Sequence, residues 1–241
     1  LFSGIFLEDE LRTNERMFRF VFRMMSKGNM VLPREGIAAA PNQLAQRLGE
    51  DHIHLNSDVS ILDHTTLDIN GETKCFDAIV RAFNPNQVNE KRHVWTLHFD
   101  AEQSPLKSQH VLLNGDVKIN DGLIAHLAVP SDVQPGYSPD GRSLVTVTVV
   151  GERADSLGLK EASEIEKAVR KEAKLWFSDA SLNWRLLAVQ HIEHALPEVG
   201  SDRPLLATPQ VHGFECGDHM LHGSVEGALL SAEAVANAVV V

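Results

Sequence analysis

The sequence has little cysteine. Its 241 residues contain two cysteines, Cys75 and Cys216, and neither belongs to a CxxC pair. Two distant cysteines exclude a disulfide-rich scaffold and a zinc site built from cysteine ligands. Because chains without disulfides are typical of reducing compartments, this count indicates a cytoplasmic protein.

Long apolar stretches and basic clusters are lacking as well. The most apolar early segment, MFRFVFRMM, is interrupted by Arg19 and Arg23 and is far shorter than the roughly 20 residues that span a bilayer. Lysine and arginine number 22 against 33 acidic residues, which gives a net charge of -11. We therefore expect no transmembrane segment and, since phosphate binding needs a clustered basic face, no nucleic-acid partner.

Several catalytic motifs are missing. The sequence contains no GxSxG elbow of a serine hydrolase, no GxxxxGK[ST] phosphate loop and no HExxH metal motif. Two histidine pairs have a spacing of three, His191 with His194 and His219 with His222. The first pair lies in a strand-like run and the second beside glycines, so we expect polar histidines and no metal site.

Three segments have the pattern of helices, at residues 13–27, about 41–48 and 160–177. The first helix carries apolar side chains on nearly every face apart from Arg19 and Arg23. Such a helix is expected to be buried in the core or to line an apolar cavity. The third is amphipathic, with one apolar face and a charged opposite face.

Short alternating runs predict strands between these helices. HIHLNSDVSILD, TTLDI and CFDAIVRAFNP indicate three strands, with NGET as a polar turn before the third. From His93 to Gly151 four runs without intervening helices predict an antiparallel sheet, and WRLLAVQHIEHALP adds another strand. This order indicates two structural units threaded by one chain.

The final stretch, FECGDHMLHGSVEGALLSAEAVANAV, combines a short strand, a glycine turn and a helix. Gly217 can form the tight turn, and Ser224 can cap a helix that starts near Gly223. The amide groups at such a helix start attract electron-rich ligands without any basic side chain. Because many strand-to-helix turns contain two glycines, the spacing alone favours a purely structural turn.

The same stretch resembles the closing FAD motif of flavin-dependent oxidoreductases, the superfamily of phytoene desaturases, amine oxidases and phytoene-dehydrogenase-related proteins. MFRFVFRMMSKGNMVLPREGIAAAPNQLAQRL resembles the segment before the chain returns to the cofactor domain, with Glu35-Gly36 where two adjacent glycines are usual. HIHLNSDVSILD and FDAIVRAFNP resemble the two returning strands. The resemblance covers nearly the whole chain.

The resemblance implies an α+β substrate domain with an antiparallel sheet, formed by residues 1–50 and 90–197. It further implies a partial α/β FAD-binding domain, formed by residues 51–89 and 198–241. The family's GxGxxG motif in its N-terminal Rossmann unit does not occur in this sequence. We therefore expect a C-terminal portion of a larger enzyme, which lacks the N-terminal FAD-binding segment, binds FAD poorly and is inactive alone.

Residues that contact FAD follow from the same resemblance. Gly217 and Asp218 match the pair beside the ribityl and pyrophosphate part, and residues 222–225 match the helix start near the flavin ring. The implied cofactor-binding residues are Val59, Gly217, Asp218, His222, Gly223, Ser224 and Val225. Three residues in the loop after the returning strand also match the family, namely Ala82, Asn84 and Pro85. Two neighbours, Arg81 and Phe83, depart from the small or apolar residues that the family has at these positions.

The implied activity is hydride transfer from a small-molecule substrate to FAD. The sequence has a single tyrosine, Tyr137, and no aromatic pair precedes Gly217 as in many amine oxidases. We therefore expect a dehydrogenase or desaturase of an apolar substrate more than an amine oxidase. A non-catalytic binding module that retains the fold without the cofactor is the alternative.

Overall fold

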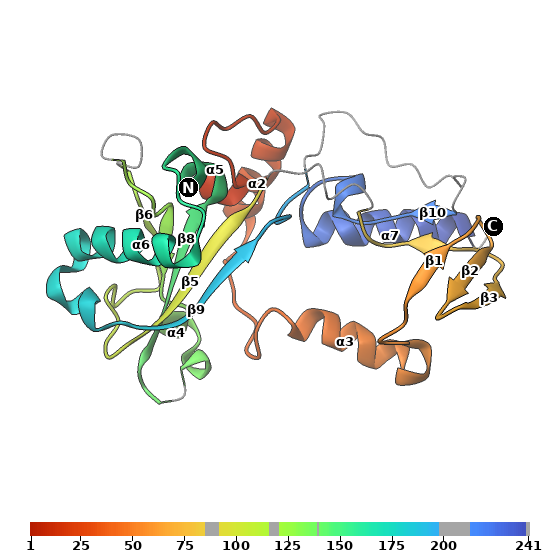
Figure 1. The fold of residues 1–241 in the computed structure, drawn as a ribbon, viewed down its shortest axis with the longest axis horizontal. Helices are drawn as coiled ribbons and strands as arrows, with labels where there is room; N and C mark the ends of the chain where they lie inside the picture. The colour runs from red at the N-terminus through yellow and green to blue at the C-terminus, as the bar shows by residue number, and fades with distance from the viewer. Residues whose placement is uncertain (85–91, 116–120, 139, 198–212, 240–241) are drawn as a thin grey trace. The chain divides into compact units, whose positions relative to one another are not determined.

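The computed structural model describes residues 1–84, 92–115, 121–138, 140–197 and 213–239. The chain divides into two units by its internal contacts (Figure 1). The first unit comprises Leu1–Thr13, Phe18–Ala39 and Lys91–Leu196, and the second comprises Asn14–Met17, Ala40–Glu90 and Pro197–Val241. Residues 40–50, which the predicted boundaries place with the first unit, therefore cluster with the second.

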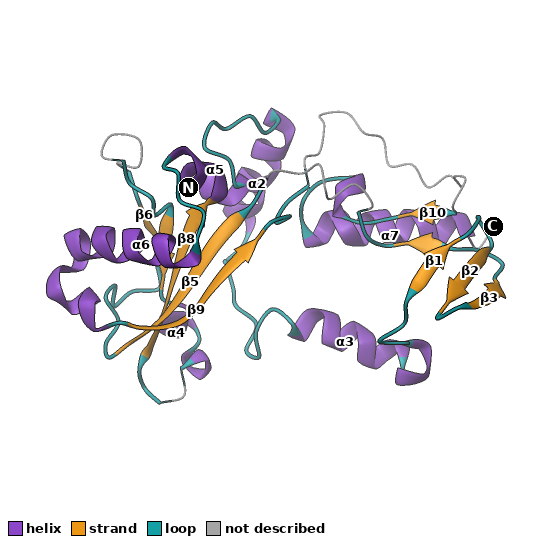
Figure 2. Cartoon of the chain, viewed as in Figure 1, coloured by secondary structure: helices purple, strands orange, loops and turns teal. Residues whose placement is uncertain are grey.

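A five-stranded antiparallel sheet forms the centre of the first unit (Figure 2). Its order is β6-β7-β8-β5-β9. The strands are β5 Val94–Ala101, β6 Leu112–Leu113, β7 His126–Ala128, β8 Ser143–Val150 and β9 Arg185–Ile192. The predicted antiparallel sheet between His93 and Gly151 is thus confirmed, with the strand after residue 184 at its edge.

Strand β8 shows why this sheet has one buried face. Val145, Val147 and Val149 alternate with threonines and are fully buried. Because side chains alternate across a strand, the three valines share one face and pack with Leu97 and Phe99 of the neighbouring β5. This face is the hydrophobic core of the first unit.

Helix α6, Ala162–Phe177, contributes to the same core. Ile165, Val169 and Ala173 are buried at helical spacing and belong to the cluster formed with the sheet. A reciprocal capping box begins the helix, in which the side chains of Glu161 and Glu164 each accept a backbone hydrogen bond. The predicted amphipathic helix at 160–177 is therefore confirmed.

Three shorter helices pack against β8: α1 Phe2–Phe6, α4 Pro130–Val133 and α5 Gly151–Ser156. The segment after α1 carries a fully buried carboxylate, Glu8. Glu8 accepts hydrogen bonds from the Arg92 guanidinium, at 3.1 Å, and from the Thr13 amide, at 2.7 Å. A buried charge is tolerated here because it is paired and hydrogen-bonded.

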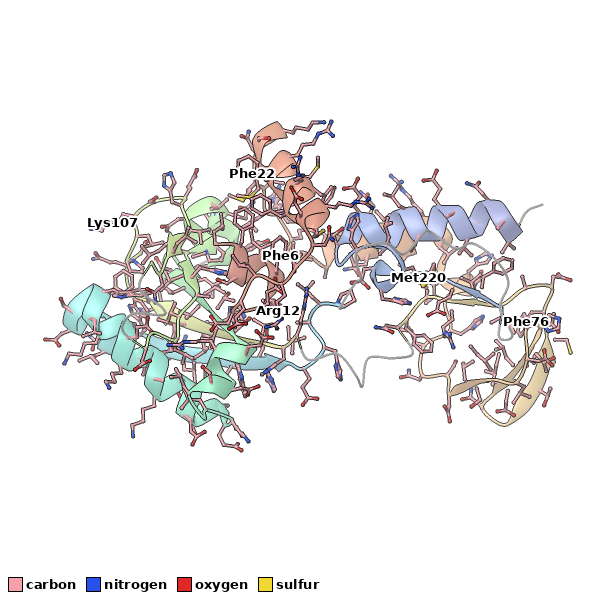
Figure 3. The ribbon with its side chains drawn as sticks, turned by 90° about the horizontal axis from the view of Figure 1, so that it is seen from above. Phe6, Arg12, Phe22, Phe76, Lys107 and Met220 are labelled. Atoms are coloured by element: carbon pink, nitrogen blue, oxygen red, sulfur yellow. The ribbon has the colours of Figure 1, made fainter. Side chains whose placement is uncertain are left out.

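Helix α2, Glu15–Lys27, is exposed, so the expectation of burial on most sides is wrong. No residue of this helix is buried within the described chain, and Phe22 (Figure 3) is 59% exposed. Phe18 stacks on Phe22 and meets Phe2 of α1 at a centroid distance of 4.7 Å. The apolar pattern of the helix is present, but the described part of the chain leaves much of its apolar face uncovered.

The second unit contains two small sheets. Strands β1 Val59–Ile61, β2 Thr66–Ile69 and β3 Glu72–Cys75 form an antiparallel sheet, and β4 Val80–Arg81 pairs in parallel with β10 Phe214–Glu215. The helices of this unit are α3 Ala39–Leu48 and α7 Val225–Val239. Together the two units confirm the predicted α+β architecture with an antiparallel sheet and a partial α/β portion.

The predicted third strand is wrong in its extent. Cys75 ends β3 and pairs with Thr66, so the run CFDAIVRAFNP contains the end of one strand and the separate two-residue strand β4. Asn70 and Gly71 both have positive φ and make a tight hairpin turn that folds β3 onto β2. All four residues of β3 are exposed, so this edge strand lacks the alternation by which a strand is recognised.

No helix in the described ranges is long and apolar enough to span a membrane.

Candidate functional site

The candidate site lies in the second unit, where β10 leads towards α7. The Phe214 amide donates to the Ile79 carbonyl at 2.8 Å, and the Cys216 amide donates to the Arg81 carbonyl at 2.9 Å. Gly213, with φ +93°, precedes these bonds, and a Cβ at this position would clash with the Ile79 carbonyl. The two backbones thus approach so closely that glycine is required at residue 213.

Residues 217–224, between β10 and α7, form a turn that we call the closing turn. It begins at Gly217, which has φ 141°. The Gly217 amide donates to Ser231 Oγ of α7 at 2.8 Å, and Ser231 Oγ lies 2.9 Å from the Gly217 carbonyl. Since Ser231 is buried, this hydroxyl fastens the start of the closing turn to the helix.

A buried polar network lies beneath the closing turn. Arg81 donates to Glu215 Oε2 at 2.9 Å, and Nε2 of His219 donates to Glu215 Oε1 at 2.9 Å. Met220, labelled in Figure 3, ends the single 3-10 turn Asp218–Met220 that carries His219. Asp218 Oδ1 accepts from the His219 amide at 2.8 Å, and the Asp218 side chain is 41% exposed.

The network affects two titrating groups. Burial alone raises the pKa of Glu215, but hydrogen bonds from Arg81 and His219 outweigh it and hold this pKa below its ordinary value. Burial, followed by the nearby Glu215 charge, raises the pKa of the Cys216 thiol. Glu215 is therefore a stable carboxylate at neutral pH, whereas Cys216 is a protonated, buried thiol without nucleophilic character.

Helix α7 begins with a side-chain cap. Ser224 Oγ accepts from the Gly227 amide at 3.0 Å, and the same hydroxyl lies 2.9 Å from His222 Nδ1. A Cβ at Gly227 would clash with the His222 carbonyl, so the turn folds tightly over the first helical residues. The backbone amides of Val225 and Glu226 have no acceptor within the described part of the chain.

The structure brings most of the predicted site residues together. Six lie in the closing turn and at its junction with α7: Gly217, Asp218, His222, Gly223, Ser224 and Val225. Val59 lies instead in β1 of the three-stranded sheet and is 47% exposed. Ala82 and Asn84 follow β4, and Pro85 lies outside the described residues.

The sequence analysis did not identify the contribution of three residues to the shape of this turn, namely Glu215, His219 and Ser231. Ser231 could have been found from spacing, because Gly227, Ser231 and Val235 recur every four residues and are all buried. The Glu215–His219 bond has a spacing of four as well, but a strand and a 3-10 turn carry these residues. No helical pattern in the sequence therefore predicts the Glu215–His219 bond.

The remaining histidine pair lies in the first unit. His191 in β9 stacks on Trp95 at a centroid distance of 4.0 Å and shares a 2.8 Å hydrogen bond with His93. His93 Nε2 lies 3.1 Å from Asp155 Oδ2 of α5. Burial, together with the neighbouring His93, lowers the pKa of His191.

A family model described as flavin containing amine oxidoreductase matches residues 1–240. The chain belongs to this family. The membership confirms the predicted superfamily, with a flavin as its cofactor. A comparison with curated proteins gave no match.

Solved structures of flavin-dependent oxidases share the fold of this chain. A proposed protoporphyrinogen oxidase from an Exiguobacterium species has a TM-score of 0.65 and 13% identity, over 86% of this chain and 51% of its own. Cyclohexylamine oxidase from Brevibacterium oxydans has a TM-score of 0.58 and 14% identity, over 85% of this chain and 52% of its own. Putrescine oxidase bound to putrescine has a TM-score of 0.57 and 12% identity, over 86% and 53%. The chain thus spans about half the length of these structures.

The residues of the closing turn fit the flavin and ribityl part of FAD. Gly217 presents backbone without a side chain, and the half-exposed Asp218 carboxylate can accept hydrogen bonds from hydroxyl groups. The amides of Val225 and Glu226 lie in the first turn of α7, at the positive end of the helix dipole. Arg81, the cation beneath the turn, is paired with Glu215, so the turn suits hydroxyls and an electron-rich ring better than a bare phosphate.

Proposed function

We propose that the protein containing this chain acts in hydride transfer from a small-molecule substrate to FAD. The observation that carries the proposal is the glycine turn at Gly217, followed by a capped helix whose first two amides have no acceptor among the described residues, in a chain that matches the flavin family over residues 1–240. The flavin supplies the chemistry by accepting the hydride. The protein residues bind and orient it.

Two residues of the closing turn and the first two amides of α7 have roles in this proposal. Gly217 gives the closing turn its positive φ, and a side chain there would meet the His219 ring. Asp218 accepts hydrogen bonds from the ribityl hydroxyls. The amides of Val225 and Glu226 offer a positive potential to the ring edge that becomes electron-rich when the flavin is reduced.

The side chains of α2 support an apolar substrate. Four of its apolar residues are exposed, namely Phe18, Phe22, Met24 and Met25. Aromatic and methionine side chains commonly line sites for apolar ligands. The single tyrosine, Tyr137, donates its hydroxyl to the Pro33 carbonyl at 2.6 Å and is therefore engaged in the structure.

An amine is the second candidate substrate. Two of the similar structures are oxidases named for amines, cyclohexylamine and putrescine, although they share only 12–14% identity with this chain. At this identity the likeness concerns the fold, so we rank an amine below an apolar substrate.

The two cysteines, which are free thiols, support the proposed cytoplasmic location.

The test is the flavin itself. Purified full-length protein should show the absorbance bands of oxidised flavin, and anaerobic addition of substrate should bleach them. An apolar polyene, a primary amine and a buffer control, added in separate experiments, separate the two substrate classes. A colourless protein that takes up no FAD on incubation would overturn the proposal in favour of a non-catalytic binding module.

A further inference from the structure

A buried charge network links strand β4 to the closing turn. Arg81 of β4, Glu215 of β10 and His219 have side chains that are only 20%, 11% and 7% exposed. Glu215 bridges the other two, because its two carboxylate oxygens accept one hydrogen bond each, at 2.9 Å. Hydrogen bonds to charged groups are stronger than neutral ones, so this link is a firm one.

His219 is the member of the network that reaches the closing turn. A Cβ placed on Gly217 would lie 2.6 Å from Cε1 and Nδ1 of the His219 ring, so the ring occupies the space beside this glycine. Nδ1 of the same ring lies 3.9 Å from Asp218 Oδ1. His219 therefore contacts both residues that are proposed to meet the cofactor, Gly217 through its ring and Asp218 through its backbone amide, which donates to Asp218 Oδ1 at 2.8 Å.

One member of the network departs from the family resemblance. Arg81 stands where the family resemblance leads us to expect a small or apolar residue, and a buried guanidinium is costly unless it is paired. Glu215 pairs it, and His219 uses the second carboxylate oxygen. The compensation for one unusual residue thus extends to the closing turn.

Two residues contact Gly217 separately. Ser231 of α7 binds its backbone amide, while the His219 ring packs where a side chain would lie. The Met220 and Leu221 amides close the turn by donating to the carbonyls of Gly217 and Asp218, at 3.1 Å each. Such a turn is preorganised, which reduces the ordering cost of binding a ligand.

We propose that His219 is a positioning residue for the flavin: held by Glu215 and Arg81, it keeps Gly217 and Asp218 in the shape that receives the cofactor. This inference rests on the proposed function. The imidazole does not contact the flavin in this proposal and acts only through the turn. It should therefore alter cofactor affinity through local order.

Two substitutions test the role of the ring. His219→Leu removes the N–H that binds Glu215, and His219→Gln retains a donor group. We expect FAD affinity of the full-length protein, measured by quenching of flavin fluorescence, to fall about tenfold in His219→Leu and to recover most of that loss in His219→Gln. His98→Leu is the matched control, because His98 makes one half-buried side-chain bond, to Thr146 in the first unit.

Amide hydrogen exchange of the flavin-free protein gives a second measurement that does not depend on cofactor. Exchange at Met220 and Leu221 should accelerate in His219→Leu, while the interior of α7 stays as slow as in the unchanged protein. Uniform acceleration over the second unit would reduce His219 to a general stabilising residue and overturn the inference.

The outcomes also separate the inference from the proposed function. Unchanged protein that binds FAD, together with His219→Leu that binds it within about twofold as well, would overturn the positioning role alone. Unchanged protein that binds no FAD would overturn the proposed function and the inference with it. If His219→Leu fails to fold, His219→Phe, which keeps a ring beside Gly217 but cannot bind Glu215, replaces it in both measurements.

Discussion

Gly217 is the single residue on which the shape of the closing turn most depends. Its φ of 141° lies in a region that L-amino acids avoid, and a Cβ would press on the His219 ring at 2.6 Å. Gly217→Ala should therefore lower the free energy of unfolding by about 1–3 kcal/mol and weaken FAD retention. Urea denaturation and flavin absorbance measure the two effects.

Gly28→Ala is the control for this substitution, because nothing lies within 4 Å of a Cβ at Gly28. We expect it to leave both stability and FAD retention unchanged within error. Equal stability of Gly217→Ala and the unchanged protein would contradict the strained turn described here.

Ser231 is the second residue whose effect can be predicted. Its hydroxyl accepts from the Gly217 amide and is buried with 2% exposure. Ser231→Ala leaves that amide buried without a partner, which should cost about 1–3 kcal/mol in the free energy of unfolding. Ser156→Ala removes an exposed hydroxyl bond within α5 and should cost clearly less. Equal losses in the two variants, measured by urea denaturation, would contradict the role of Ser231.

At the level of elements, His191 in the edge strand β9 predicts that the stability of the folded protein depends on pH. His191 is an exposed residue whose ring is partly covered by Trp95, and this partial burial, with the neighbouring His93, lowers its pKa. The unfolded chain therefore takes up a proton at this residue before the folded chain does as the pH falls. The folded state therefore loses stability as the pH falls below the ordinary histidine value. His191→Phe keeps an aromatic ring against Trp95 but cannot titrate.

Urea denaturation at about pH 7.5 and pH 5.5 tests this dependence. The loss of unfolding free energy between the two pH values should be smaller in His191→Phe than in the unchanged protein. His64→Phe, at an exposed position of the second unit, serves as the control and should retain the full loss. A loss as large in His191→Phe as in the control would show that His191 is not responsible.

The elements also show which structure the sequence could predict. Helix α6 and strand β8 were predictable because their apolar residues follow the helical and the alternating period against one core. Strand β3 was not, since all its side chains are exposed and only the Asn70–Gly71 turn places it against β2. Burial of α2 was wrongly predicted because an apolar pattern does not specify which element covers it.

The candidate site divides in the same way. The positive φ of Gly217 and the cap at Ser224 follow from local rules for glycine and serine, so both were predictable. The bond from Arg81 to Glu215 joins residues 134 positions apart, and no local pattern encodes it. What the sequence could not reveal is therefore the tertiary support of the turn.

At the scale of the whole molecule, the order of helices and strands along the chain predicts two units, but it does not predict which elements belong to each unit. Helix α3 clusters with the second unit, although its neighbour α2 is shared mainly with the first. A short helix pattern states which face is apolar and leaves open which sheet that face meets. Contacts between distant segments, such as β4 with β10, determine the second unit.

Ligand-linked stability is the prediction that involves the whole molecule. A cofactor that binds the folded state and not the unfolded state stabilises the protein, by about 2.7 kcal/mol at a concentration of 100 times Kd. We expect FAD to raise the thermal midpoint of the full-length protein, and we expect a smaller rise in Gly217→Ala. The measurement is a thermal melt at increasing FAD concentration.

Comparing variants in this melt tests whether the closing turn is needed for FAD binding. Ser231→Ala starts from a lower midpoint because it destabilises the turn, yet it retains the Gly217 backbone, so saturating FAD should recover part of the loss. Gly28→Ala should respond to FAD as the unchanged protein does. An equal rise in all four proteins would mean that FAD binds without the closing turn, and the cofactor residues would then have to lie elsewhere in the chain.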